Sequence, residues 1–254
     1  MEEQVALIEH ACAVFENPSN QAAHQEASAT LLAFRNSAAP IGVCQHVLQS
    51  SSSEQAKFQK QLTGTVAVLL KRGWVDESPE ERHAFFSEVE STVAGTSDAA
   101  ARRTGIEILE AVVSEFAPST ASPLGLAWEQ HDRCRKSLQQ HYLHTFYQHA
   151  ATIAGETAQA ATQGQDQGVC SACLSLMAAV LTWDFRPGNG HAAYLGTRPA
   201  SDSLQVQPGP SWRGLLLGPD SCPWLHPLLA HLHNQPDSVL AQRARQLVVS
   251  LRAT

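Results

Sequence analysis

The chain has 254 residues, of which 43% are hydrophobic, 16% are charged and only 6% are aromatic. A chain of this length can bury a large core, either as one long domain or as an array of small units. It carries 17 basic and 24 acidic residues, for a formal net charge of −7, whereas nucleic-acid-binding proteins usually show a basic surplus or stripe. The composition therefore disfavours nucleic acid as a partner and is compatible with a basic protein partner.

Six cysteines are too few for a disulfide framework in a chain of this length. The chain begins MEEQ and lacks the basic and then apolar pattern of a secretory signal. Its longest uncharged apolar run, residues 169–183, is shorter than the ~20 residues that cross a membrane. We therefore expect a soluble protein of a reducing compartment.

Apolar residues recur at helical spacing through most of the chain, and Pro, Gly and Ser fall between the periodic segments. No alternating β-branched run is long enough to predict a strand. The periodicity predicts helices at about 3–16, 20–36, 40–48, 54–72, 79–94, 98–116, 127–139, 141–160, 168–185, 221–234 and 237–252. A four-serine run at 50–53 is interpreted as a linker.

Residues 64–78 carry the clearest local signals for a helix, a tight turn and an antiparallel helix. Lys71 and Arg72 suit the negative end of a helix dipole. Gly73 stands where a left-handed C-cap would fall, and Trp74 is expected to pack back on the turn.

The next helix begins with a capping-box signature, since Ser78 is followed by Pro79 and, three residues on, by Glu81. Ser97 is the predicted N-cap of the helix at 98–116. Gly64 inside the helix at 54–72 costs ~1 kcal/mol relative to alanine, and a close helix–helix approach there would explain it.

Helix pairs recur every ~40 residues, which is the period of HEAT-type hairpins. One hairpin cannot bury its apolar face alone, so neighbours stack into a solenoid with an extended concave surface. We therefore predict an all-α fold, a right-handed αα superhelix of HEAT/ARM-like helical hairpins in a single domain over 1–254. Its predicted parts are the first helices (1–49), central hairpins (54–163) and C-terminal hairpins (167–254) with a loop at 186–212.

The predicted C-terminal helix has an apolar stripe (Leu240, Ala244, Leu247 and Leu251) with no predicted neighbour to cover it. A finished solenoid would carry a polar capping repeat at this point. The pattern therefore predicts a solenoid that is truncated at its C-terminus.

Cys170 and Cys173 have the CxxC spacing of redox and zinc sites, but the chain has no second CxxC pair and the surrounding pattern is apolar. We interpret both as core cysteines. No phosphate loop, dinucleotide fingerprint or nucleophile elbow occurs. These patterns predict a protein that is not an enzyme and holds no metal or cofactor.

Cys134, His141 and His144 are spaced so that they could share one helix face and bind a metal. No other histidine extends the pattern regularly, and a helix break near 140 would separate the three. We interpret them as solvated side chains on a helix surface. A helical metalloenzyme is the alternative, and it would require stoichiometric zinc.

Basic residues near predicted helix ends are the remaining candidates for a site. They are Arg35, Lys71, Arg72, Arg102 and Arg103. Dipole compensation and solubility are one interpretation. The functional interpretation is contact with a partner protein laid along the inner face of the solenoid.

Six stretches, in this order along the chain, resemble the N-terminal part of nuclear export receptors of the importin-β superfamily. They are LLAFRNSAAPIGVCQHVL (31–48), AVLLKRGWVDES (67–78), VVSEFAPS (112–119), GLAWEQHDRCRKSLQ (125–139), LMAAVLTWDFRP (176–187) and SWRGLLL (211–217). Together they span most of the chain.

The resemblance implies a receptor that binds cargo together with the GTP-bound small GTPase Ran, without enzymatic activity or cofactor. It also implies Phe-Gly nucleoporins as partners and shuttling, as a monomer, between nucleus and cytoplasm. Compared with these receptors, the chain lacks roughly one hairpin, ~40 residues, near 49–57, in the region that faces Ran in this superfamily. A HEAT-repeat scaffold that binds protein partners without Ran is therefore the alternative.

Overall fold

The computed structural model describes residues 56–95, 98–117, 126–185, 208–218, 221–233, 235 and 238–253. The helices predicted N-terminal to residue 50, the serine linker and Arg35 lie outside these ranges. The described residues form helices and no strand: α4 (Ala56–Gly73), α5 (Pro79–Gly95), α6 (Ala99–Phe116), α7 (Trp128–His141), α8 (Leu143–Thr162), α9 (Gln167–Leu181), η2 (Pro210–Trp212), α11 (Arg213–Leu217), α12 (Leu225–Leu232) and α13 (Val239–Ala253).

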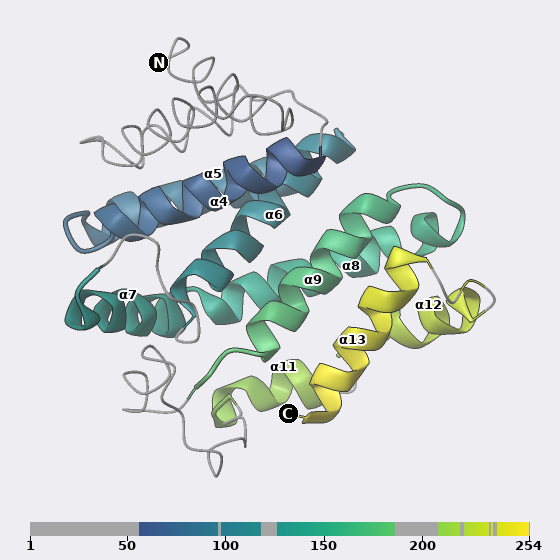
Figure 1. The fold of residues 1–254 in the computed structure, drawn as a ribbon. Helices are drawn as coiled ribbons and strands as arrows, with labels where there is room; N and C mark the ends of the chain where they lie inside the picture. The colour runs from purple at the N-terminus through teal and green to yellow at the C-terminus, as the bar shows by residue number, and fades with distance from the viewer. Residues whose placement is uncertain are drawn as a thin grey trace, which may run out of the picture.

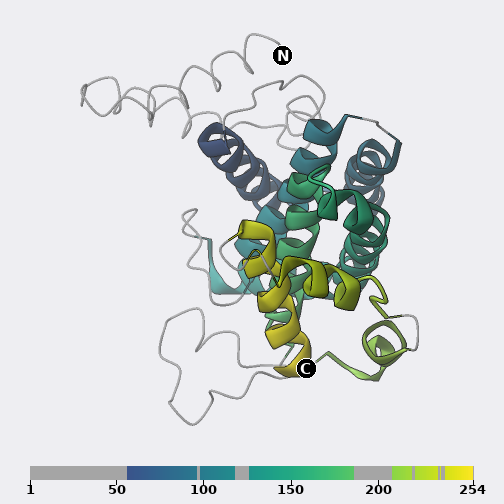
Figure 2. The ribbon, with the colours of Figure 1, turned by 90° about the vertical axis from the view of Figure 1, so that its right-hand side faces the viewer.

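These helices alternate between two layers (Figures 1 and 2). The first layer contains α4, α6, α9 and α13, each packed against the next. The second contains α5, α8 and α12, and α8 packs against α12. The pairs α5–α6, α8–α9 and α12–α13 join the layers. This arrangement confirms the predicted all-α fold of stacked helical hairpins. The predicted boundary between the central hairpins (54–163) and the C-terminal hairpins (167–254) lies between α8 and α9. These two helices pack closely against each other.

Most predicted helices in the described ranges are present, and the largest differences lie toward the C-terminus. The helix predicted at 168–185 ends at Leu181, and the one predicted at 221–234 is reduced to α12. Within and just after the predicted loop at 186–212, η2 and α11 form two short turns of helix. Such turns are too short to produce a detectable helical period. None of the helices in the described ranges has the length and apolarity to cross a membrane.

The capping box predicted at the start of α5 is confirmed. The backbone N–H of Glu81 donates to Ser78 Oγ at 3.1 Å, and the N–H of Ser78 donates to Glu81 Oε2 at 2.8 Å. These hydrogen bonds lower the pKa of Glu81. The N-cap of α6 is Asp98, whose carboxylate accepts from the N–H of Ala100 at 2.9 Å. The predicted N-cap, Ser97, lies outside the described residues.

The left-handed C-cap predicted at Gly73 is wrong. Gly73 is the last residue of α4 and has no positive φ, because its carbonyl continues the turn by accepting from the N–H groups of Asp76 and Glu77. The left-handed glycine is instead Gly164 (φ 84°) after α8. There the N–H of Gln165 donates to the carbonyl of Ala160 at 2.9 Å, as in a Schellman motif.

The close approach predicted at Gly64 is also wrong, since a Cβ at that position would have no atom within 4 Å. The close approach lies at Gly105, where α6 crosses α5. A Cβ at Gly105 would overlap Cγ2 of Val93 and lie 3.7 Å from Cγ1 of Val89. Glycine is therefore required for packing at Gly105, and not at Gly64.

We expect the two glycines to respond oppositely to alanine. Gly64→Ala should raise the free energy of unfolding by up to about 1 kcal/mol, because alanine favours the helix and open space surrounds its methyl group. Gly105→Ala should lower it by about 1–3 kcal/mol, because Val93 must move. Urea unfolding of both variants measures the difference. A stabilising effect of Gly105→Ala would contradict this account of the α5–α6 crossing.

An aromatic cluster fills the core where the α4–α5 turn meets α6 and the start of α8. Trp74 is 1% exposed, and its ring centroid lies 4.8 Å from that of Phe116, 5.8 Å from Tyr142 and 6.0 Å from Phe86. The Phe86 ring in turn lies 4.9 Å from Phe146. The cluster thus ties both layers together at the α4–α5 turn.

Candidate functional site

A groove crosses the first layer of helices. It consists of a hollow of ≈ 450 Å³ between α4 and α6 and an adjoining hollow of ≈ 470 Å³ between α6, α9 and α13. Both hollows are lined by Arg103, Glu107, Glu110 and Arg243, and we call them together the central groove. Much of the remaining wall is formed by small side chains: Gly64, Ala67, Ala111, Ser171, Ala172 and Ser175. These small side chains leave room for the backbone of a partner segment to approach the helices. The lining carries both positive and negative side chains.

Arg103 lies at the centre of this region. It lines both hollows of the central groove and a third hollow of ≈ 430 Å³ at the first turns of α6 and α9. Its Nε donates to Glu107 Oε1 at 2.6 Å, and its side chain is 40% exposed. The Arg103 side chain lies against the first turn of α9, where a Cβ at Gly168 would be 3.4 Å from Arg103 Cδ, an ordinary van der Waals distance. Of the predicted partner-facing residues, Arg103 is the one in the described ranges that lines the groove.

The other arginines of that set do not gather with it. Arg102 donates from Nε to the carbonyl of Val93 at 2.9 Å and pairs with Glu156 at 3.3 Å, and its side chain is 18% exposed. It joins α6 to α5 and α8. Arg72 is half-buried at the end of α4, and Arg35 lies outside the described residues.

Lys71 cannot face a partner, because it is buried with 0% exposure. Its Nζ donates to the carbonyl of Glu115 at 2.5 Å and to Glu115 Oε1 at 3.1 Å, and it lies 5.7 Å from the centroid of the Phe116 ring. Burial lowers the pKa of Lys71, and the carboxylate of Glu115 partly offsets this. The prediction of an exposed lysine failed because helix periodicity locates the helix end but not the helix that later covers it.

The interpretation of Cys134, His141 and His144 as solvated side chains on a helix surface holds for the two exposed histidines and is wrong for Cys134. Cys134 is fully buried, its thiol donates to the carbonyl of Lys71 at 3.7 Å, and burial raises its pKa to about 11. His141 ends α7, whereas His144 on α8 packs against Trp212 with ring centroids 5.2 Å apart. Within the described ranges, no group of three or more His, Cys, Asp or Glu side chains could hold a metal ion.

Cys170 and Cys173 are core cysteines, as predicted. Both are buried free thiols on α9. Burial raises the pKa of each, that of Cys170 to about 11, so neither thiol is activated. They pack in the helix that contacts α6, α8 and α13.

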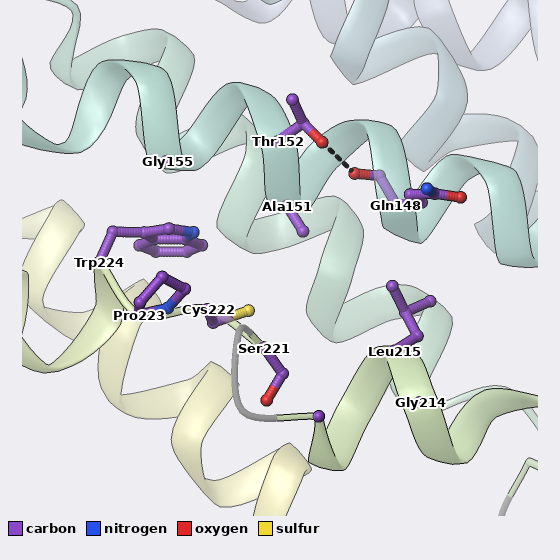
Figure 3. A pocket seen from close by; sticks show the side chains of 11 residues that line it. Gln148, Ala151, Thr152, Gly155, Gly214, Leu215, Ser221, Cys222, Pro223 and Trp224 are labelled. Atoms are coloured by element: carbon purple, nitrogen blue, oxygen red, sulfur yellow. Dashed lines mark hydrogen bonds between the residues drawn. The ribbon is translucent and has the colours of Figure 1, made fainter.

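A separate hollow of ≈ 370 Å³ opens between α8, α11 and the segment before α12 (Figure 3). Trp224 and Pro223 form one side, facing Ala151 on α8, and Leu215 on α11 lies at the other end. The Trp224 ring is seated against Gly155, where a Cβ would lie 2.8 Å from Trp224 Cδ1. We call it the Trp224 hollow.

Sequence reasoning missed both the Trp224 hollow and the contribution of Arg243 to the central groove. The available signal for the Trp224 hollow was Gly155 inside a predicted helix, since such a glycine marks a place where another chain segment comes close. No periodicity shows which segment that is. No protein-family model matches the chain.

Proposed function

We propose that this chain is the N-terminal part of an exportin-4-like nuclear export receptor. It binds protein cargo together with GTP-bound Ran, without a cofactor, and shuttles as a monomer between nucleus and cytoplasm. The observation that carries the proposal is the central groove, which runs across α4, α6, α9 and α13. Stacked helical repeats bind protein partners along such extended surfaces.

The stretches that resemble export receptors contact one another in the fold, which supports the proposal. Residues 67–78 meet residues 112–119 through the Lys71–Glu115 ion pair at 3.1 Å. They meet residues 125–139 through the hydrogen bond from the Cys134 thiol to the Lys71 carbonyl at 3.7 Å.

The same chain of contacts continues toward the C-terminus. Trp183 Nε1 donates to Gln139 Oε1 at 3.1 Å, which joins residues 125–139 to residues 176–187. Phe185 and Trp212 then pack with ring centroids 5.5 Å apart, which joins residues 176–187 to residues 211–217. The resemblance therefore falls on residues that hold successive helices together, as expected if the chain shares the superhelix of these receptors.

A Phe-Gly nucleoporin repeat is proposed to insert its phenylalanine into the Trp224 hollow. The hollow presents the Trp224 ring beside the apolar side chains of Leu215, Pro223 and Ala151. An aromatic pair gains ~0.5–1.5 kcal/mol beyond the buried area. Labelled Phe-Gly peptides should bind the chain, and peptides with Ser-Gly in place of Phe-Gly should not. Trp224→Ala should abolish the difference.

Equilibrium binding to Ran loaded with GTP or GDP tests the main proposal. The chain should prefer the GTP form, and Ser171→Trp should weaken that binding by filling the central groove. Ser87→Trp is the matched control, because Ser87 is exposed on α5 in the other layer. A folded, helical sample that binds neither Ran form would overturn the receptor proposal. Binding of another protein without Ran would favour a scaffold.

A further inference from the structure

We infer that the Trp224 hollow binds a short, uncharged, extended segment of a partner protein, laid along α8 with an aromatic side chain at its centre. The indole N–H of Trp224 at one end of the hollow and the side-chain amide of Gln148 at the other donate hydrogen bonds to backbone carbonyls of that segment. The inference rests on the proposed use of this hollow by a Phe-Gly repeat. It adds which backbone groups of the repeat are bound and which residues bind them.

The hollow follows one face of α8. The α8 residues that line it are spaced i, i+3, i+4 and i+7: Gln148, Ala151, Thr152 and Gly155. At 1.5 Å per residue this stripe is about 10 Å long, the length of about three residues of extended chain. The volume of ≈ 370 Å³ lies in the range of about 300–1,000 Å³ that is typical of small-ligand sites. An extended tripeptide therefore matches the hollow in length.

The lining of the hollow is uncharged. Among the described residues that form it, none is Asp, Glu, His, Lys or Arg. Its titratable group, the Cys222 thiol, stays neutral because burial raises its pKa. A charged occupant would lose hydration without gaining a counter-charge, whereas a neutral one avoids this cost. Charge complementarity therefore selects an uncharged segment.

Trp224 supplies a hydrogen-bond donor at one end. Its ring lies against Gly155, where a Cβ would be 2.8 Å from Trp224 Cδ1 and 3.1 Å from Nε1. Figure 3 shows the nitrogen edge of the ring turned toward Ala151 and the hollow. The indole N–H donates to no described residue. Because an indole can only donate, its partner in the hollow must be an acceptor such as a backbone carbonyl.

Gln148 supplies the donor at the other end. Thr152 uses its hydroxyl within α8, where it donates to the main-chain carbonyl of Gln148 at 3.0 Å. The side-chain amide of Gln148 forms no hydrogen bond with a described residue. Ala151 lies between the two donors, and Pro223 and Leu215 flank it (Figure 3). This apolar centre is the place for the aromatic ring, so the backbone on either side of the ring reaches the donors.

Nuclear magnetic resonance of the isotope-labelled chain tests the inference, because the indole N–H of each tryptophan gives its own signal. The Trp224 signal is assigned by its loss in Trp224→Phe. The probes are N-acetyl-Gly-Phe-Gly-amide and toluene, which carries the same ring without a backbone. The tripeptide should bind and shift the Trp224 indole proton downfield, as a new hydrogen bond does. Toluene should not produce that downfield shift.

Gln148→Leu should weaken tripeptide binding about three- to tenfold, the loss expected for one hydrogen bond between neutral groups, and should not weaken toluene binding. Gln159→Leu is the matched control, because Gln159 is exposed on the same helix outside the hollow. Gly155→Ala should weaken binding of both probes, because its methyl group displaces the Trp224 ring. Gly64→Ala, with open space around its methyl group, should leave both unchanged. Circular dichroism checks that each variant is folded.

The inference is overturned if the tripeptide does not move the Trp224 indole proton downfield, or if toluene moves it equally. It is also overturned if Gln148→Leu weakens tripeptide binding no more than Gln159→Leu. Failure of the nucleoporin proposal gives a different result. A downfield shift with the tripeptide, in a chain that does not bind labelled Phe-Gly repeats, would support the site and reject the repeat as its occupant. Repeats that bind without the shift would support the repeat and reject the inference.

Discussion

Replacing Trp74 with alanine is expected to lower the free energy of unfolding by about 3–5 kcal/mol. Trp74 is 1% exposed and, with Trp183, is one of the two largest fully buried side chains among the described residues. Its removal takes away ring contacts with Phe116, Tyr142 and Phe86 at once, and also the ring on which Arg82 lies, 5.2 Å from the centroid. Because these residues come from both layers, the cavity cannot close by a shift of one helix.

Urea unfolding followed by circular dichroism gives the magnitude, with Trp74→Phe as the matched variant. Trp74→Phe should cost less, because it keeps an aromatic ring and removes an indole N–H that has no hydrogen-bond partner among the described residues. A loss of under about 1 kcal/mol for Trp74→Ala would show that the cluster does not organise the core.

Glu115→Ala is expected to destabilise the fold by about 3–5 kcal/mol, because it leaves the buried ammonium of Lys71 without its counter-charge. The Lys71 side chain has 0% exposure and that of Glu115 has 10%, so water cannot replace the carboxylate. Lys136→Ala is the control: its ion pair with Asp132 involves a lysine side chain that is 55% exposed, and removing it should cost under about 1 kcal/mol.

The pH dependence of the Glu115→Ala variant follows from Lys71. Burial already lowers the pKa of Lys71 from 10.5, and loss of the carboxylate that raises it should lower it further. Between this folded pKa and 10.5, the unfolded chain binds more protons than the folded chain, so the free energy of unfolding increases with pH. The variant should therefore lose less stability near pH 10 than near pH 7.

A double variant separates the charge from the packing. Lys71→Met combined with Glu115→Leu should recover most of the stability lost in Glu115→Ala, because it removes both buried charges and fills similar volume. If the double variant is as unstable as Glu115→Ala, the stability lost in Glu115→Ala comes from packing around residue 115. It then does not come from the uncompensated charge of Lys71.

The fold class and several local features could be predicted from the sequence. Ser78 and Glu81 form the predicted capping box, because all the atoms involved lie within three residues. The burial of Trp74 and Cys170 follows from apolar spacing along their own segments. The hairpin period identified the αα architecture, which the two alternating layers confirm.

Features set by neighbouring helices could not be predicted in this way. The N-cap of α6 was misplaced by one residue, since Ser97 and Asp98 are both good caps and only the backbone geometry selects between them. The tight approach was assigned to Gly64 rather than Gly105, because the crossing point depends on α5, a different helix.

The same distinction between local features and features set by neighbouring helices applies to the candidate site. The sequence by itself determined the helices, their main caps and the alternation that makes stacking the way to bury their apolar faces. Only the tertiary structure decided that Lys71 is enclosed by α6 while Arg103 and Arg243 share a groove with the first turns of α9 and α13. The reason is physical: helix period and capping depend on residues up to four apart, whereas burial and the grouping of charges depend on which helices pack together.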